Sequence, residues 1–186
     1  APLRAAYTQL LDRLEKGLSR GIESAVRVAT EEKTRYFAER ILRTESARAW
    51  GEGFFDQVER DPDATGLRWE NSSAHRIFDV CDFHQRADLF GMGPGVYPKE
   101  HRPSYPAHPH CLCALSAWYR GTPQPQVDAG GKRALDAMSD GERTRLLGIN
   151  GAEAFAQNGQ WRGRLRNWTD PAGTRLSQGA SEILES

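Results

Sequence analysis

Cysteine and histidine side chains are concentrated in one stretch of the chain, residues 78–118. This stretch holds all three cysteines and four of the five histidines among the 186 residues. Cys81 and His84 form a C-x-x-H pattern, and a later H-x-x-C pattern ends at Cys111, two residues before Cys113. A two-residue gap lets both side chains of a tight turn reach one ion, and zinc prefers tetrahedral sets of nitrogen and sulfur ligands. The spacing therefore predicts a zinc site.

The predicted site has more candidate ligands than the four positions of a closed zinc site. Cys81, His84 and Cys111 take the first three positions, and for the fourth His108 is favoured ahead of Cys113 and His110. Because a fully ligated site leaves no coordination position open, such a zinc would hold structure rather than attack a substrate. The candidate metal ligands are Cys81, His84, His108, Cys111 and Cys113.

The segment between the two halves of the predicted site is rich in glycine and proline. Such residues disfavour a helix or a central strand. A long irregular loop needs a clamp at its base, and a bound metal would supply one. The residues concerned are Gly91, Gly93, Pro94, Gly95, Pro98, Pro103, Pro106 and Pro109.

Two other interpretations of the cysteines stay open. The three thiols could be reduced and half-buried in a polar cluster without a metal. In an oxidising compartment Cys81 could pair with Cys111 or Cys113, although an odd number of cysteines argues against a purely disulfide framework.

The composition limits the classes of function. With 186 residues the chain is one domain, or a compact domain with helical extensions. A mean hydropathy of -0.68 and 38% hydrophobic residues indicate a lean core and a large wetted surface. Lys plus Arg and Asp plus Glu are both 25, so general binding to duplex DNA is disfavoured. Because no apolar run approaches the ~20 residues that span a bilayer, we expect no membrane contact.

A helical arm is predicted for residues 1–60. Apolar residues from Leu3 to Val26 recur at three- and four-residue steps, which indicates one face of a helix. Gly17 and Gly21 predict a break or bend near residue 20, and a second helix continues to about residue 60. This arm is either one layer of a helical core or a partner-binding face.

Residues 61–120 are predicted to form a Cys/His-rich α+β module. Residues 67–69 alternate like a short strand, and residues 71–77 favour a brief helical turn carrying His75. The alternation of Cys111, Cys113 and Leu115 predicts a second strand, which we expect to pair with the first in a small sheet.

Residues 121–131 are predicted to be a linker, followed by a C-terminal helical segment at 132–186. Within that segment Ser139 and Glu142 predict a capping box that opens a helix, and the pair Asn150-Gly151 predicts its end or interruption. Residues 176–186 favour a short helix or a disordered end.

Trp161 and Trp168 in this segment are interleaved with arginines. Such a pattern suits stacking on nucleic-acid bases, but it is also typical of buried tryptophans beneath a solvated basic face. Taken together, the predictions define an α+β fold with an N-terminal helical arm, a small zinc-clamped sheet module with a long Gly/Pro loop, and short C-terminal helices.

A series of sequence motifs occurs in a particular order over about residues 35–150. R-T-E stands on a helix, a tryptophan strand follows, and D-x-C-D-x-H, G-x-G-P-G-x-Y-P and P-x-H-P-x-C-x-C complete the series, with SDGERTRLLG beyond. The matching residues are Arg43, Thr44, Glu45, Trp69, Asp79, Cys81, Asp82, His84, Asp88, Gly91, Gly93, Pro94, Gly95, Tyr97, Pro98, Pro106, His108, Pro109, Cys111 and Cys113.

In this order of motifs the sequence resembles the phage head morphogenesis family, the phage Mu F-like minor head proteins. Many members have two cysteines where this chain has Cys81 and His84, and either pair suits zinc. The resemblance implies a bacteriophage virion protein, a minor capsid component in viral head assembly rather than an enzyme. Its expected partners are portal, neck or capsid proteins and packaged DNA, in several copies or as a homo-oligomer, within a particle assembled in the host cytoplasm.

The alternative is a metal-dependent nuclease or another phage DNA-processing enzyme. In that interpretation a histidine activates water and carboxylates hold a hard ion. The residues that would serve are His101, His108, His110, Asp79, Asp82 and Asp88.

Overall fold

The structure, a computed structural model, describes residues 2–16, 22–121 and 127–168. The chain divides into two compact units, Ala1–Ser46 and Ala47–Ser186. Each unit is described by itself below.

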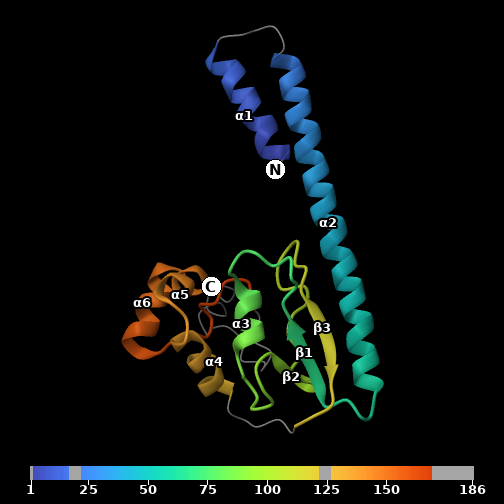
Figure 1. Cartoon of the computed structure of the whole chain (residues 1–186), viewed down its shortest axis with the longest axis vertical. Coiled ribbons are helices and arrows are strands. Elements are labelled where there is room, and N and C mark those ends of the chain that lie inside the picture. The colour runs from blue at the N-terminus through green and yellow to red at the C-terminus, as the bar shows by residue number, and fades with distance from the viewer. Residues whose placement is uncertain (1, 17–21, 122–126, 169–186) are drawn as a thin grey trace, which may run out of the picture. The chain divides into compact units, whose positions relative to one another are not determined.

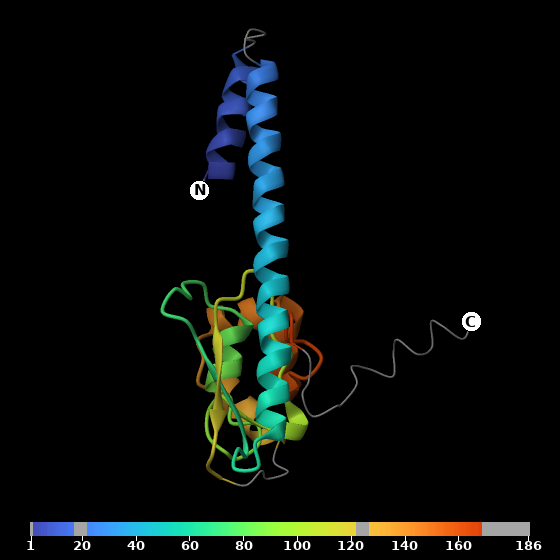
Figure 2. The same cartoon turned by 90° about the vertical axis from the view of Figure 1, so that its right-hand side faces the viewer.

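The first unit is a pair of helices, α1 (Pro2–Glu15) and the N-terminal part of α2 (Ile22–Arg60). The two lie side by side in both views (Figures 1 and 2). Ala6, Ala25 and Ala29 are buried in this unit, and small side chains of this kind let two helices approach closely. Both predicted helices are confirmed, and the predicted break near residue 20 lies outside the described residues.

Large apolar side chains of the first unit remain exposed. Phe37, Ile41 and Leu42 on α2 are 43%, 63% and 67% exposed, and Leu11 and Leu14 on α1 are also exposed. Helices in proteins are stabilised mainly by tertiary packing of an apolar face. These side chains instead lie at the surface of the described unit. Within the part of the chain that the structure describes, no helix is long and apolar enough to cross a membrane.

The second unit contains a three-stranded antiparallel sheet in the order β2-β1-β3. Its strands are β1 (Gly66–Glu70), β2 (Val96–Pro98) and β3 (Ala114–Trp118). Trp69 is paired with Leu115, so the predicted pairing of the two segments is confirmed. The Gly/Pro-rich segment supplies β2, which is an edge strand, as expected where proline cannot donate to both neighbours.

Helices frame this sheet, which lies between α3 and the C-terminal part of α2 in Figure 1. Helix α3 (Val80–Arg86) begins after Asp79, and a short 3-10 turn, η1, covers Lys99–His101. Trp50 of α2 lies 5.6 Å, between ring centroids, from Tyr105 in the loop. The C-terminal part of α2 thus belongs to the packing of the second unit.

Three short helices follow: α4 (Val127–Asp136), α5 (Asp140–Leu147) and α6 (Ile149–Asn158). The predicted Ser139 capping box opens α5. The helix break predicted at residues 150 and 151 lies at Gly148 instead. Gly148, with a φ of 74°, ends α5, and helix α6 then runs through residues 150 and 151. Glycine adopts this left-handed backbone without the penalty of a Cβ.

The tryptophans after α6 belong to the hydrophobic core. Trp161 and Trp168 are 3% and 5% exposed, and their rings lie 5.4 and 5.8 Å from that of Phe83 on α3. Of the two interpretations of the Arg/Trp segment, burial of the tryptophans is therefore the one observed, and bases cannot stack on these rings.

The observed boundaries differ from those predicted for the segments. The compact second unit begins at Ala47, inside α2, whereas the arm was expected to extend over residues 1–60. Residues 122–126 of the predicted linker lie outside the described residues, and α4 already begins at Val127. The coarse fold is as expected: helices combined with a small antiparallel sheet.

Candidate metal centre

Three buried thiols come together between α3 and β3. Cys81 lies in the first turn of α3, while Cys111 and Cys113 stand in the segment that leads into β3. All three are free and buried, and the sulfurs of Cys81 and Cys111 are 3.7 Å apart. Leu112 between them is 51% exposed, so the predicted alternation places both flanking cysteines on the buried side.

His108 reaches the same thiols from the preceding turn. Its Nε2 is 3.2 Å from the Cys81 sulfur, and its Nδ1 is 2.9 Å from the carbonyl oxygen of Pro109. The backbone N–H of Cys111 donates to the His108 carbonyl at 3.1 Å, and His110 has a left-handed φ of 62°. The H-x-x-C segment is therefore a tight turn, as predicted, and it directs His108 and Cys111 to one place.

His75 joins the cluster from the other side, although the sequence analysis did not select it as a ligand. Its Nε2 is 2.8 Å from an Asp82 carboxylate oxygen. The segment before α3 is a turn, with the His75 N–H donating to Ser72 at 2.9 Å, rather than the expected helical turn. Its nearness in sequence to the C-x-x-H pattern was the one available signal.

These side chains lie within metal-binding distance of one another in three groups. Within each group of the described residues, one ligand atom per residue lies within 4.8 Å of the others. Cys81 is common to the two groups that contain sulfur, and the third group has only nitrogen and oxygen. The groups are Cys81, His108 and Cys111; His75, Cys81 and Cys113; and His75, Asp79 and Asp82.

His84 lies outside these groups, which corrects its predicted role as a ligand. Its ring stacks on Trp69 with the centroids 4.4 Å apart, and its Nδ1 is 2.8 Å from the Tyr97 hydroxyl. Burial lowers the pKa of His84 to about 3. The C-x-x-H residues occupy a helix rather than a tight turn, and the imidazole serves as a neutral core side chain.

Of the residues named for hydrolytic chemistry, Asp88, His101 and His110 lie outside all three groups. Asp88 accepts a hydrogen bond from the Gly93 N–H at 3.1 Å, which supports the loop. His101 stacks on Phe90 with the ring centroids 5.2 Å apart. His110 belongs to none of the three groups.

Hydrogen bonds within the cluster shift the pKa values of its thiols and of His108. Hydrogen bonds from Cys113 and Cys81 lower the pKa of Cys111, so its thiolate is the favoured anion. Hydrogen bonding to Cys111 raises the pKa of Cys81 and of Cys113. The hydrogen bond to Asp79 raises the pKa of His108 to about 9. A cation that binds thiolates and neutral imidazole would displace these protons.

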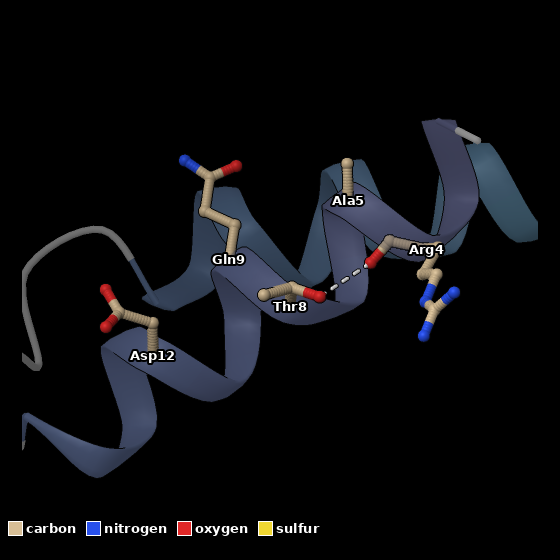
Figure 3. Close-up of a pocket in the computed structure, with 5 residues that line it drawn as sticks. All are labelled: Arg4, Ala5, Thr8, Gln9 and Asp12. Carbon is tan, nitrogen blue, oxygen red and sulfur yellow. Dashed lines mark hydrogen bonds between the residues drawn. The ribbon is translucent and has the colours of Figure 1, made fainter.

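A surface pocket on α1 is lined by no thiol or imidazole side chain. Its lining comes from one face of α1, and Figure 3 shows these side chains along that helix. Thr8 donates to the Arg4 carbonyl at 3.0 Å, an ordinary bond within a helix. The lining residues are Arg4, Ala5, Thr8, Gln9 and Asp12.

Comparison of the chain with protein-family models, curated protein sequences and solved structures found no significant match.

Proposed function

We propose that this chain is a structural minor head protein of a phage or phage-like particle, with a structural zinc ion at the cysteine cluster. Cys81, Cys111, Cys113 and His108 would hold the ion, with His75 beside them. The bound zinc would supply a cross-link and no reaction step.

The spacing of the ligand atoms carries the zinc proposal. With zinc–sulfur bonds of about 2.3 Å, two sulfurs of a tetrahedral site lie ~3.8 Å apart. The sulfurs of Cys81 and Cys111 are 3.7 Å apart, and the Cys81 sulfur is 3.2 Å from the His108 nitrogen. These two distances are close to donor–donor edges of a zinc tetrahedron.

The place of the cluster favours a structural role over catalysis. Cys81 is fully buried, and Cys111 and Cys113 are 6% and 3% exposed. The segment between Cys81 and Cys111 includes the edge strand β2, so a metal would close the base of this long loop. Closed ligand sets of thiolates and imidazole are typical of structural zinc sites.

The partner-binding part of the proposal concerns the helical arm. Phe37, Ile41 and Leu42 are exposed on α2, which supports docking against another protein. The resemblance of the sequence to the Mu F-like proteins names portal, neck or capsid proteins as these partners. Contact with packaged DNA rests on that resemblance, and the buried Trp161 and Trp168 leave only the arginine side chains for it.

Elemental analysis tests the zinc clamp directly. Freshly purified, reduced protein is expected to contain one zinc per chain. Cys111→Ser is expected to lose it, whereas Leu112→Ala, at the exposed neighbouring position, is expected to keep it. Wild-type protein without stoichiometric zinc would overturn the clamp.

The assembly role needs a measurement on particles. Mass spectrometry of purified particles and antibody labelling are expected to place the chain, in few copies, at the portal or neck. Cys111→Ser is expected to reduce its incorporation, with Leu112→Ala as the matched control. Complete absence of the chain from purified particles would contradict the assembly role.

A metal-dependent nuclease remains the second candidate because of the group formed by His75, Asp79 and Asp82. Nitrogen and carboxylate oxygen suit a hard divalent ion. If the chain is a nuclease, it cleaves plasmid DNA with Mg²⁺ or Mn²⁺, and His75→Ala abolishes cleavage in a folded protein. No cleavage with either ion would eliminate this candidate.

A further inference from the structure

Each helix of the first unit carries an exposed apolar stripe beside its buried one. On α1 the exposed stripe begins directly after buried Ala6, and on α2 it begins directly after buried Ala25. One residue further along an α-helix lies about 100° further round its axis. The exposed stripes consist of Tyr7, Leu11 and Leu14 on α1, and of Val26, Phe37 and Ile41 on α2.

The two stripes lie on the same side of the helix pair. Helices α1 and α2 run antiparallel, as Figures 1 and 2 show. Viewed from one end, two antiparallel helices have opposite rotational senses, so an equal turn away from their facing sides leads to the same side of the pair. The six exposed side chains therefore form one continuous surface, which we call the apolar face.

The first unit has little apolar core of its own. Among its described residues the buried apolar side chains are three alanines, Ala6, Ala25 and Ala29. Alanine removes little apolar surface from water, and units shorter than about 40–70 residues generally need a disulfide, a metal or a further chain to complete their core. The larger side chains of the apolar face would supply that core if another chain covered them.

The spacing along α2 identifies which chain fits. Val26, Thr30, Phe37 and Ile41 share one side of the helix and follow each other at steps of four, seven and four residues. This order of steps reads the same in both directions, so it matches itself when a second copy of α2 lies antiparallel. Val26 of one copy then faces Ile41 of the other, and the small Thr30 faces the large Phe37. The two-fold axis passes between positions 33 and 34.

The charges of α2 permit this self-association. Residues 22–46 carry five basic and five acidic side chains. Arg27 pairs with Glu31, and Arg35 pairs with Glu32, within the same helix. Two copies of a neutral helix do not repel each other, whereas a nucleic acid or another strongly charged partner finds no net opposite charge on it.

The same axis also covers the part of α2 that α1 does not reach. Helix α1 has 14 residues and lies beside only the first part of α2 in both views (Figures 1 and 2). Phe37 and Ile41 lie beyond this part. An axis at positions 33 and 34 brings α1 of the second copy to their level, so each copy completes the helix pair of the other.

We propose that the apolar face is a dimer interface, at which a second copy of this chain docks antiparallel to form a four-helix bundle. The proposal depends neither on the zinc site nor on the role in head assembly. Leu42 lies about 100° from Ile41 round the helix, outside the apolar face. Its exposed side chain therefore remains outside the interface in the dimer.

Sedimentation of the purified full chain over a wide range of protein concentrations tests the interface. Wild-type protein is expected to be a dimer. Ile41→Glu and Phe37→Glu are each expected to raise the Kd of the dimer roughly 100-fold or more, because a two-fold interface would bury two unpaired carboxylates. Leu42→Glu, the matched control on the same helix, is expected to leave the dimer intact. Circular dichroism checks that all three variants remain helical, since glutamate is a good helix former.

A short thiol-reactive cross-linker tests the orientation. Thr34→Cys is expected to link the two copies, because position 34 lies beside the two-fold axis. Val26→Cys is expected not to link them, because the two Val26 positions are about 22 Å apart in the antiparallel pair but adjacent in a parallel pair. Wild-type protein, whose three free cysteines are buried, controls for background linkage.

The results that would overturn the proposal are distinct. Wild-type protein that stays monomeric at every concentration would exclude the dimer and leave the apolar face to a different protein. A dimer that survives both glutamate substitutions would place the interface elsewhere on the chain. Linkage through Val26→Cys, or its failure in Thr34→Cys, would overturn the antiparallel arrangement.

Discussion

Removal of the proposed zinc ion, or of its proposed ligand Cys111, is expected to destabilise the compact unit 47–186. The cluster joins positions 30 residues apart, Cys81 and Cys111. For a cross-link that closes a loop of this length, the chain-entropy relation gives about 3.6 kcal/mol. A reversible ligand present at a hundredfold excess over its Kd contributes about 2.7 kcal/mol. We therefore expect a loss of about 3 kcal/mol.

Thermal unfolding makes this loss measurable. At about 2–4 °C per kcal/mol for a domain of this size, the Tm should fall by roughly 6–12 °C on chelation and recover when zinc is added back. Cys111→Ser should show the low Tm and no response to zinc. His101→Gln is the matched control, because His101 stacks on Phe90 outside the cluster.

A Tm that stays unchanged on chelation, in Cys111→Ser and in His101→Gln would show that no metal stabilises the loop. In that case the loop would be held by its packing and hydrogen bonds alone. A drop in Tm for Cys111→Ser that chelation does not reproduce would assign the effect to lost packing of the thiol.

Three further predictions concern the second unit. Oxidation of metal-free protein should link Cys81 to Cys111, whose sulfurs are 3.7 Å apart, and peptide mapping will identify the pair. Gly130→Ala should destabilise the protein, since an added Cβ would lie 1.6 Å from a backbone oxygen, whereas Gly141→Ala should be neutral or gain up to about 1 kcal/mol in urea unfolding. Stability should fall as the pH drops below 6.5, because burial lowers the pKa of His84 to about 3, and chelator-treated protein should lose about 2 kcal/mol between pH 6.5 and 5.

The direction of the pH effect on stability follows from the protonation of His84 in the folded and the unfolded chain. Below pH 6.5 the unfolded chain binds a proton at His84, whereas the folded chain resists it until about pH 3, so acid favours unfolding. His84→Gln should remove this part of the slope, and an unchanged slope would contradict a buried neutral imidazole. For the other two predictions, a disulfide through Cys113 or a fully stable Gly130→Ala variant would be the opposing result.

Features that depend on neighbours in the sequence were predictable. The helical periodicity of the arm, the Ser139 capping box and the tight turn from His108 to Cys111 are all set within a few residues. The alternation that buries Cys111 and Cys113 follows from the two-residue repeat of an extended chain. The concentration of thiols and imidazoles likewise follows from the sequence alone.

Which imidazole meets the thiols was decided only by tertiary structure. The C-x-x-H spacing made His84 a candidate metal ligand. In the fold, however, Trp69 and Tyr97, which come from two different strands, enclose its ring in the core. His75 reaches the cluster because Asp82 holds its ring. Phe83 likewise buries the two C-terminal tryptophans, whose sequence pattern alone also suited base stacking. Contacts between distant segments set these outcomes, because local patterns define which side chains are near in sequence and packing selects which of them meet.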